Sequence, residues 1–238
     1  MRSDRVSQWF DHPQHGPLPA LLLVLTAATG VVDAVSILAL GRVFIANMTG
    51  NIVFIGFALA GAPGFSLAAA LLALAGFLIG AGIGGQMIGR WRTTRGRLLA
   101  MVTSLEVGLL AGALAIAAVS AEPFASAPRD LIAVLGAVAL GMQNAAAREL
   151  AVPDATTTVL TMTLTGFAAD LRQRNGRVLL RRLLAVGAML AGASAGAALV
   201  LRQSTTSALA LAVALVALAC AGAWVLGRRP GAWQAAAH

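Results

Sequence analysis

The residues best suited to chemistry in this sequence are polar side chains inside long apolar stretches. Asp33 lies within the apolar stretch 18–41. A carboxylate at such a depth costs at least about 3 kcal/mol unless it is paired, neutralised or facing water. Asp33 is therefore a candidate for proton coupling, for cation binding, or for accepting hydrogen bonds from neighbouring helix ends. The functional and the structural interpretations have equal weight.

A second group of polar residues surrounds Gly50. We expect an extended run to about Met48 and then a short helix that starts near Thr49 to Asn51, because Thr and Asn are N-cap residues and Gly permits close backbone approach. The amide groups at the start of such a helix would suit an anion or a carbonyl oxygen. Alternatively, Asn47, Thr49 and Asn51 only satisfy backbone groups that the break exposes.

The second half of the chain contains a matching Thr-rich stretch, residues 156–169. Most of its hydroxyls are expected to bond to carbonyls one turn back in their own helix. Thr163, the counterpart of Thr49, is the exception that we assign to the site. Asn144 is the uncharged counterpart of Asp33, so a symmetric two-carboxylate site is not expected. The candidate substrate or ion site comprises Asp33, Asn47, Thr49, Gly50, Asn51, Asn144 and Thr163.

Glu106 is a weaker candidate of the same kind. It lies about two turns into the apolar stretch 98–120. Water or the long side chain of Arg97 could reach it there.

Other residue types argue against an enzyme. Cys220 is the single cysteine, and the histidines lie outside the apolar stretches. A disulfide framework or a thiolate metal site cannot be built from one cysteine. Ser36 beside Asp33 is too little for a mechanism, and no serine has a convincing base. We expect no catalytic residue, no metal and no cofactor.

Composition indicates the elements that carry these residues. Hydrophobic residues make up 59% of the 238 positions and charged residues 11%, which is far from a soluble protein. A helix needs about 20 apolar residues to cross roughly 30 Å of hydrocarbon. Stretches of that length lie at 18–41, 66–89, 98–120, 130–150, 178–201 and 206–227. Shorter, interrupted or re-entrant segments lie at 44–61 and 156–169. The predicted fold is all-α, a membrane helix bundle.

The basic residues predict the topology. The net charge of +8 comes from Arg placed between apolar stretches rather than in a nucleic-acid-binding stripe, so no nucleic-acid partner is expected. Six crossings with a cytoplasmic N-terminus leave only Arg42, Arg129 and Arg202 outside. Seven crossings with an outside N-terminus, in which 44–61 also crosses, stays an open alternative. We expect a tail at 1–17, one transmembrane domain at 18–227 and a tail at 228–238.

An internal repeat relates residues of about 18–120 to those of about 130–227. Gly30 to Ala34 matches Gly141 to Ala145, and Met48-Thr49 matches Met162-Thr163. Small residues spaced by four also recur, each at the same distance along the sequence from its counterpart: Gly76, Gly80 and Gly84 correspond to Ala188, Gly192 and Gly196. Arg90 corresponds to Arg202 at that same distance. Three crossings per copy would turn the second copy upside down, an architecture of many transporters and channels.

The spaced glycines also predict helix packing. Gly76, Gly80, Gly84, Gly192 and Gly196 form small-residue faces that let helices approach closely. We expect them between the two repeats or between the subunits of a homo-oligomer. The Arg-rich stretches 90–97 and 172–182 are interpreted as topology determinants and contacts for anionic lipid.

These motifs resemble a known family. Asp33-Ala34-x-Ser36, Leu40-Gly41, Phe44, Asn47-Met48-Thr49-Gly50-Asn51 and Gln143-Asn144-Ala145 are similar to the YoaK family of small bacterial integral membrane proteins, a domain of unknown function. The resemblance covers nearly the whole chain, and Met-Thr-Gly-Asn is its most specific part. Ile37 stands where an aromatic residue is expected. The resemblance implies a multi-pass protein of the bacterial inner membrane with about six helices, and no substrate.

Two functions compete at this point. The first is a transporter or channel for a small solute or ion, with the candidate site between two inverted repeats. The second is a non-transporting membrane scaffold or assembly factor, whose polar breaks are structural and whose glycine faces bind partner helices. Both place the chain in contact with the lipid bilayer.

Overall fold

The helices follow the apolar stretches of the sequence. The computed structural model describes residues 14–90, 94–153, 157, 161, 164–165, 176–228 and 231–235. Its elements are α2 (Leu18–Ala39), α3 (Met48–Leu59), α4 (Leu67–Arg90), α5 (Arg95–Val119), α6 (Ser126–Leu150), α8 (Gly176–Arg202), α9 (Thr205–Leu226) and the 3₁₀ turn η2 (Ala232–Gln234). Strands are absent from these described ranges.

Six of the described helices are long and apolar enough to cross a membrane: α2, α4, α5, α6, α8 and α9. The predicted all-α membrane bundle is thus confirmed. The main differences lie at charged helix ends. α6 begins at Ser126, before Arg129 and Asp130, whose side chains form an ion pair at 3.0 Å on the first turn. The predicted stretch begins only at 130, whereas the helix extends further because charge is accommodated where a helix leaves the hydrocarbon.

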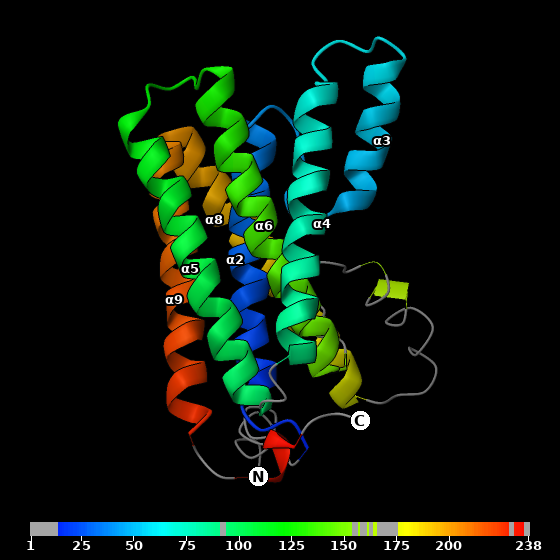
Figure 1. Cartoon of the computed structure of the whole chain (residues 1–238), viewed down its shortest axis with the longest axis vertical. Helices are drawn as coiled ribbons and strands as arrows, with labels where there is room; N and C mark the ends of the chain where they lie inside the picture. Colours follow the sequence, from blue (N-terminus) through cyan, green and yellow to red (C-terminus); the bar gives the residue numbers. More distant parts are fainter. Residues whose placement is uncertain are drawn as a thin grey trace.

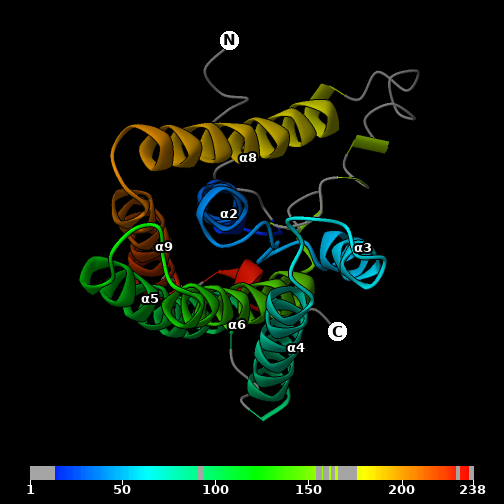
Figure 2. The same ribbon diagram turned by 90° about the horizontal axis from the view of Figure 1, so that it is seen from above.

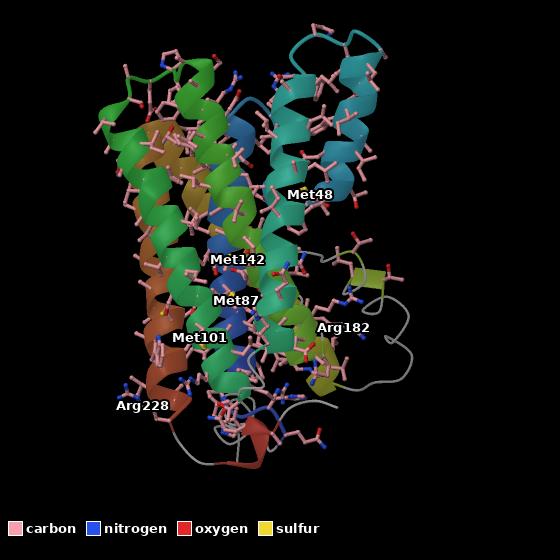
Figure 3. All side chains as sticks on the ribbon, viewed as in Figure 1. Met48, Met87, Met101, Met142, Arg182 and Arg228 are labelled. Carbon is pink, nitrogen blue, oxygen red and sulfur yellow. The ribbon has the colours of Figure 1, made fainter. Side chains whose placement is uncertain are left out.

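The helix α3 does not cross the bundle. Its 12 residues span about 18 Å at 1.5 Å per residue, short of the roughly 30 Å of hydrocarbon. In Figure 1, α3 begins part-way along the length of the bundle and leads to the same end where α4 starts, and Figure 3 labels Met48 at this beginning of α3. The six long helices alternate in direction, so α2 begins and α9 ends at the opposite end of the bundle. The arrangement matches six crossings with a re-entrant first short segment rather than seven.

Seen from above, α2 and α6 occupy the middle of the bundle (Figure 2). α8 packs on α2, and α4 packs on α6. α5 and α9 lie together on one side, where α5 also contacts α6 and α9 also contacts α2. α3 lies on the opposite side and packs on α4.

Glycine sets the close approach of α4 to α6. A Cβ on Gly80 would collide with the carbonyl oxygen of Val138, and a Cβ on Gly141 would collide with that of Phe77. One turn further on, a Cβ on Gly84 would meet the Cβ of Ala145 at 2.9 Å. Backbone rather than flexible side chain lies opposite Gly80 and Gly141, so a larger residue cannot be accommodated by a change of rotamer.

The pair α2 and α8 repeats these contacts residue by residue. A Cβ on Gly192 would collide with the carbonyl oxygen of Ala27, and a Cβ on Gly30 would collide with that of Met189. A Cβ on Gly196 would meet the Cβ of Ala34 at 3.1 Å. Each of these glycines is matched by the sequence repeat with a glycine of the α4–α6 pair: Gly192 with Gly80, Gly30 with Gly141 and Gly196 with Gly84. The glycine faces are therefore packed inside this chain.

Arg95 fastens both chain ends to the bundle. Its side chain at the start of α5 is only 8% exposed. It donates hydrogen bonds to the carbonyl oxygens of Gln14 at 3.2 Å, Trp233 at 3.5 Å and Leu150, and to Nδ1 of His15 at 3.2 Å. The interpretation of this Arg as a lipid contact is wrong, because its side chain is buried and both of its Nη groups donate to partners within the protein.

Candidate functional site

Asn51 holds the broken segment together. Its side chain is fully buried, with 0% exposure. Oδ1 accepts a hydrogen bond from the Phe44 amide at 2.8 Å, and Nδ2 donates to the Phe44 carbonyl at 2.6 Å. The carboxamide thus replaces the backbone partner that Phe44 lacks outside a helix. This arrangement agrees with the structural interpretation of Asn51.

Gly50 lies against an aromatic cluster. A Cβ there would overlap the ring of Phe44, which stacks on Phe54 with centroids 5.5 Å apart. Phe54 in turn contacts Phe57 and Phe65, with centroids 6.3 and 5.0 Å away. Gly50 is therefore needed for the packing of the break on α3.

Asn47 and Thr49 have little contact with the interior. Asn47 is the N-cap residue of α3, but its side chain makes no cap hydrogen bond, and its carbonyl accepts from the Gly50 amide at 3.1 Å. Thr49 is exposed. The helix begins one residue earlier than the sequence suggests, at Met48, since the backbone rather than a side chain closes its first turn.

Asp33 connects α2 to the break. Its Oδ1 accepts a hydrogen bond from the Ala46 amide at 3.3 Å, and its backbone carbonyl accepts from the Ser36 hydroxyl at 2.9 Å. The side chain is only half-buried. Asp33 therefore supports the extended segment, because its carboxylate bonds to the backbone of both Ala46 and Ile45.

A buried polar cluster joins α2 to α6. Gln143 is 1% exposed and donates from Nε2 to the hydroxyls of Thr29 at 3.1 Å and Thr157 at 3.0 Å. The Thr29 hydroxyl in turn donates to the Leu25 carbonyl at 3.0 Å. The Gln143 Oε1 is buried and has no hydrogen-bond partner among the described residues. An unused acceptor at this depth is available to a donor that is not part of the described chain.

Asn144 lies beside this cluster and lines a different space. It borders an open groove of about 410 Å³ between α4 and α6. The groove is lined by Phe77, Ala81, Gly85, Ile88, Asn144, Ala145, Arg148 and Glu149. Asn144 is half-buried. Thr163 lies outside the described residues.

Glu106 is more deeply enclosed than the sequence suggests. Its side chain is 0% exposed, and neither carboxylate oxygen has a hydrogen-bond partner in the described part of the chain. The expectation that water or Arg97 reaches it is wrong. Arg97 is exposed nine positions earlier on α5, about 13 Å away along the helix axis.

Sequence reasoning missed Gln143 as a site residue. The repeat drew attention to Asn144, because Asn144 aligns with Asp33. The low hydropathy of their side chains would have identified both Gln143 and Asn144, since a carboxamide inside an apolar helix needs hydrogen-bond partners. The neighbours Thr29 and Thr157 could not be identified, because Thr is common in the apolar stretches.

The fold and its polar interior define a polytopic α-helical membrane protein. The chain belongs to the family described as "Protein of unknown function (DUF1275)", whose model matches residues 21–222. It is 34% identical over 154 residues to the UPF0700 transmembrane protein YoaK of Bacillus subtilis (strain 168), covering 65% of this chain and 67% of that protein. The resemblance to the YoaK family is thus confirmed. No solved structure matches the chain.

Proposed function

We propose that this protein is a transporter or channel for a small solute or ion rather than an enzyme. The observation that carries the proposal is the buried cluster of Thr29, Gln143 and Thr157, in which the Gln143 Oε1 has no hydrogen-bond partner in the described part of the chain. A buried acceptor without a partner costs about 1–3 kcal/mol. A passing solute with an N–H or O–H donor would relieve that cost, and the helices α2 and α6 that hold the cluster are the central pair of the bundle.

The reciprocal helix pairs support an inverted-repeat architecture. α4 packs on α6 through the same matched positions by which α8 packs on α2, and α5 packs on α9. In our proposal, residues of about 18–120 form one half and residues of about 130–227 form the other, related by a twofold axis in the membrane plane. Each half would then place its short segment beside the other half's first helix, where transporters of this kind hold their sites.

The distribution of Arg supports a cytoplasmic N-terminus in the bacterial inner membrane. The end of the bundle where α2 begins and α9 ends carries Arg90, Arg95, Arg97, Arg148, Arg181, Arg182 and Arg228. The other end carries Arg42, Arg129 and Arg202. Positive charge is enriched on the cytoplasmic side of membrane proteins.

The glycine faces do not support the alternative of a membrane scaffold, in which they would bind partner helices. Gly80 and Gly192, the residues meant to receive partner helices, are already packed against Val138 and Ala27 of this chain. A partner helix would have to displace α6 or α2 from the middle of the bundle.

A ligand screen tests the proposal. Purified protein would be examined by thermal shift against a panel of small anions, amino acids and other metabolites, and every hit would be repeated on Gln143→Met and Asp33→Asn. We expect a stabilising ligand whose shift is lost in Gln143→Met. A ligand that stabilises Gln143→Met as well as the natural protein would place the site elsewhere and refute the cluster as its centre.

A further inference from the structure

Glu106 is a buried acid that the proposed solute site does not use. It lies on the face of α5 that also buries Val102, Thr103 and Leu110, and both of its oxygens lack partners among the described residues. Thr103, one turn earlier, donates to the carbonyl of Leu99 at 2.8 Å. No hydrogen-bond donor on the described part of this face is directed to the carboxyl group.

The helices packed against α5 provide no counter-charge near Glu106 in the described part of the chain. α6 carries its charged residues in its first and last turns, at Arg129, Asp130, Arg148 and Glu149. α9 and η2 contain no charged residue, and the ionisable side chain of α9 is the Cys220 thiol. On α5 itself the charged neighbours are Arg95 and Arg97, in the first turn. α2, which α9 also contacts, contributes Asp33, whose carboxylate bonds to Ala46.

The described residues around Glu106 therefore offer an ionised carboxylate neither a counter-charge nor a hydrogen-bond donor. Burial of an ionised carboxylate away from water costs several kcal/mol of desolvation free energy. Without a nearby counter-charge, that cost is not compensated. Protonation removes the charge, although the neutral acid still has a donor and an acceptor that would gain from water. The packing favours the neutral form, and any opening of the packing favours release of its proton.

We propose that Glu106 is a proton-binding site that is neutral in this arrangement and exchanges its proton with water when α5 moves away from α9. In the open arrangement the O–H bond of the acid breaks, a water molecule takes the proton, and the carboxylate remains. The reverse step restores the acid before the helices close. Coupling of this exchange to solute movement rests on the proposed transport function, whereas the exchange itself does not.

At the level of Glu106 the contacts between α5 and α9 are polar and partly exposed, and we infer that the two helices separate there. Ser104, two residues before Glu106, lies 3.3 Å from Cys220 Sγ and accepts from Trp224 Nε1 at 3.1 Å. Cys220 also lies 3.8 Å from the Ala100 carbonyl. These are weak or exposed polar contacts, whereas backbone-to-backbone glycine contacts fix α4 to α6, α2 to α8 and, about three turns before Glu106, Gly96 of α5 to Gly227 at the end of α9.

Infrared spectroscopy tests the neutral form. The full-length protein in lipid at neutral pH should show the C=O stretch of a protonated carboxyl group. We expect the band to be lost in Glu106→Gln and kept in Asp33→Asn and in Glu106→Asp, which retains an acid. Absence of the band from the natural protein, or its persistence in Glu106→Gln, would overturn the assignment.

Deuterium exchange and a reversible lock test the opening. In D2O the band should shift within minutes. Ser104→Cys places a second cysteine beside Cys220, so oxidation would link α5 to α9, and we expect exchange to slow at least tenfold until the disulfide is reduced. Ser104→Cys with Cys220→Ala, which cannot form the link, should exchange at the natural rate under the same oxidant.

The outcomes separate this proposal from the transport function. A band that does not shift in D2O means that the Glu106 proton never exchanges with water. An exchange rate that is unchanged by the disulfide excludes the separation of α5 from α9. Either result refutes the proposal. A shift that the disulfide blocks supports the proposal even if the thermal-shift panel yields no ligand. That pair of results would count against the solute site alone.

Discussion

The two helix pairs α2–α8 and α4–α6 are alike in packing and unlike in chemistry. Gly192 meets Ala27 as Gly80 meets Val138. At the polar positions, however, α2 carries Asp33 bonded to Ala46, whereas α6 carries Asn144 beside an open groove. Backbone contacts at glycine leave no freedom for change, while a side chain that faces a break or a groove can differ between the pairs. The glycine packing is therefore shared by the two helix pairs, whereas an ionisable side chain at the matched polar position, Asp33, is present in one pair alone.

The largest test of this comparison replaces the packed glycines. Gly80→Leu and Gly192→Leu should each lower the free energy of unfolding by about 3 kcal/mol or more, because backbone lies opposite both positions. Thermal denaturation in detergent would measure it. Gly82→Leu on α4 and Gly187→Leu on α8, where a Cβ meets nothing within 4 Å, are the matched controls and should be tolerated. Loss of stability at only one packed glycine would break the equivalence of the pairs.

The next test addresses the broken segment. Asn51→Ala removes two hydrogen bonds to the Phe44 backbone and should cost about 2–3 kcal/mol of stability. Asn47→Ala, at a side chain without a cap hydrogen bond, should cost less than about 0.5 kcal/mol. Denaturation of both variants side by side would measure the difference. Equal effects would mean that the buried carboxamide does not hold the segment.

A smaller effect on stability is expected at the central cluster. Gln143→Met keeps the volume and removes the bonds to Thr29 and Thr157, at a cost of about 1 kcal/mol, near the usual value for an interhelical hydrogen bond in membranes. Leu140→Met on the same helix, a volume-conserving change at a buried side chain without hydrogen bonds, is the control. A cost above about 3 kcal/mol for Gln143→Met would indicate a purely structural cluster.

The smallest effect concerns the acid of α2. Asp33→Asn retains an oxygen to accept from the Ala46 amide, so stability should change by less than about 0.5 kcal/mol. Asp33→Ala loses the acceptor and should cost about 1 kcal/mol. Thermal unfolding of the two variants would measure this difference in stability. Strong destabilisation by Asp33→Asn would show that the charge itself, rather than the acceptor, supports the break.

Segment length and hydropathy were sufficient to predict the fold. Crossing helices need about 20 apolar residues, and that requirement leaves few alternatives for where α2, α4, α5, α6, α8 and α9 lie. The repeat also predicted which glycines pack, because close approach needs residues without side chains.

The site was harder to predict, because hydrogen bonding depends on which polar atoms face each other. Sequence pattern left two interpretations of Asn51 open, a ligand site or a partner for the backbone of the break, and the hydrogen bonds of its carboxamide to Phe44 agree with the second. Glu106 was ranked below Asp33 because Arg97 lies nearby in sequence, although nine helical positions separate the two along α5. Gln143 gained its importance only from Thr29 on another helix.

Accessibility of Thr29 tests the central claim most directly. Thr29 is 0% exposed in this arrangement and lies against Gln143. Thr29→Cys in a Cys220→Ala background would be treated with a small membrane-impermeant thiol reagent from each side of reconstituted vesicles. Leu22→Cys, in the packed part of the same helix, is the buried control, and Ala121→Cys and Ala235→Cys, exposed at opposite ends, report the two sides. The account predicts labelling of Thr29→Cys from both sides; labelling from neither side, with the end controls reacting normally, would contradict it.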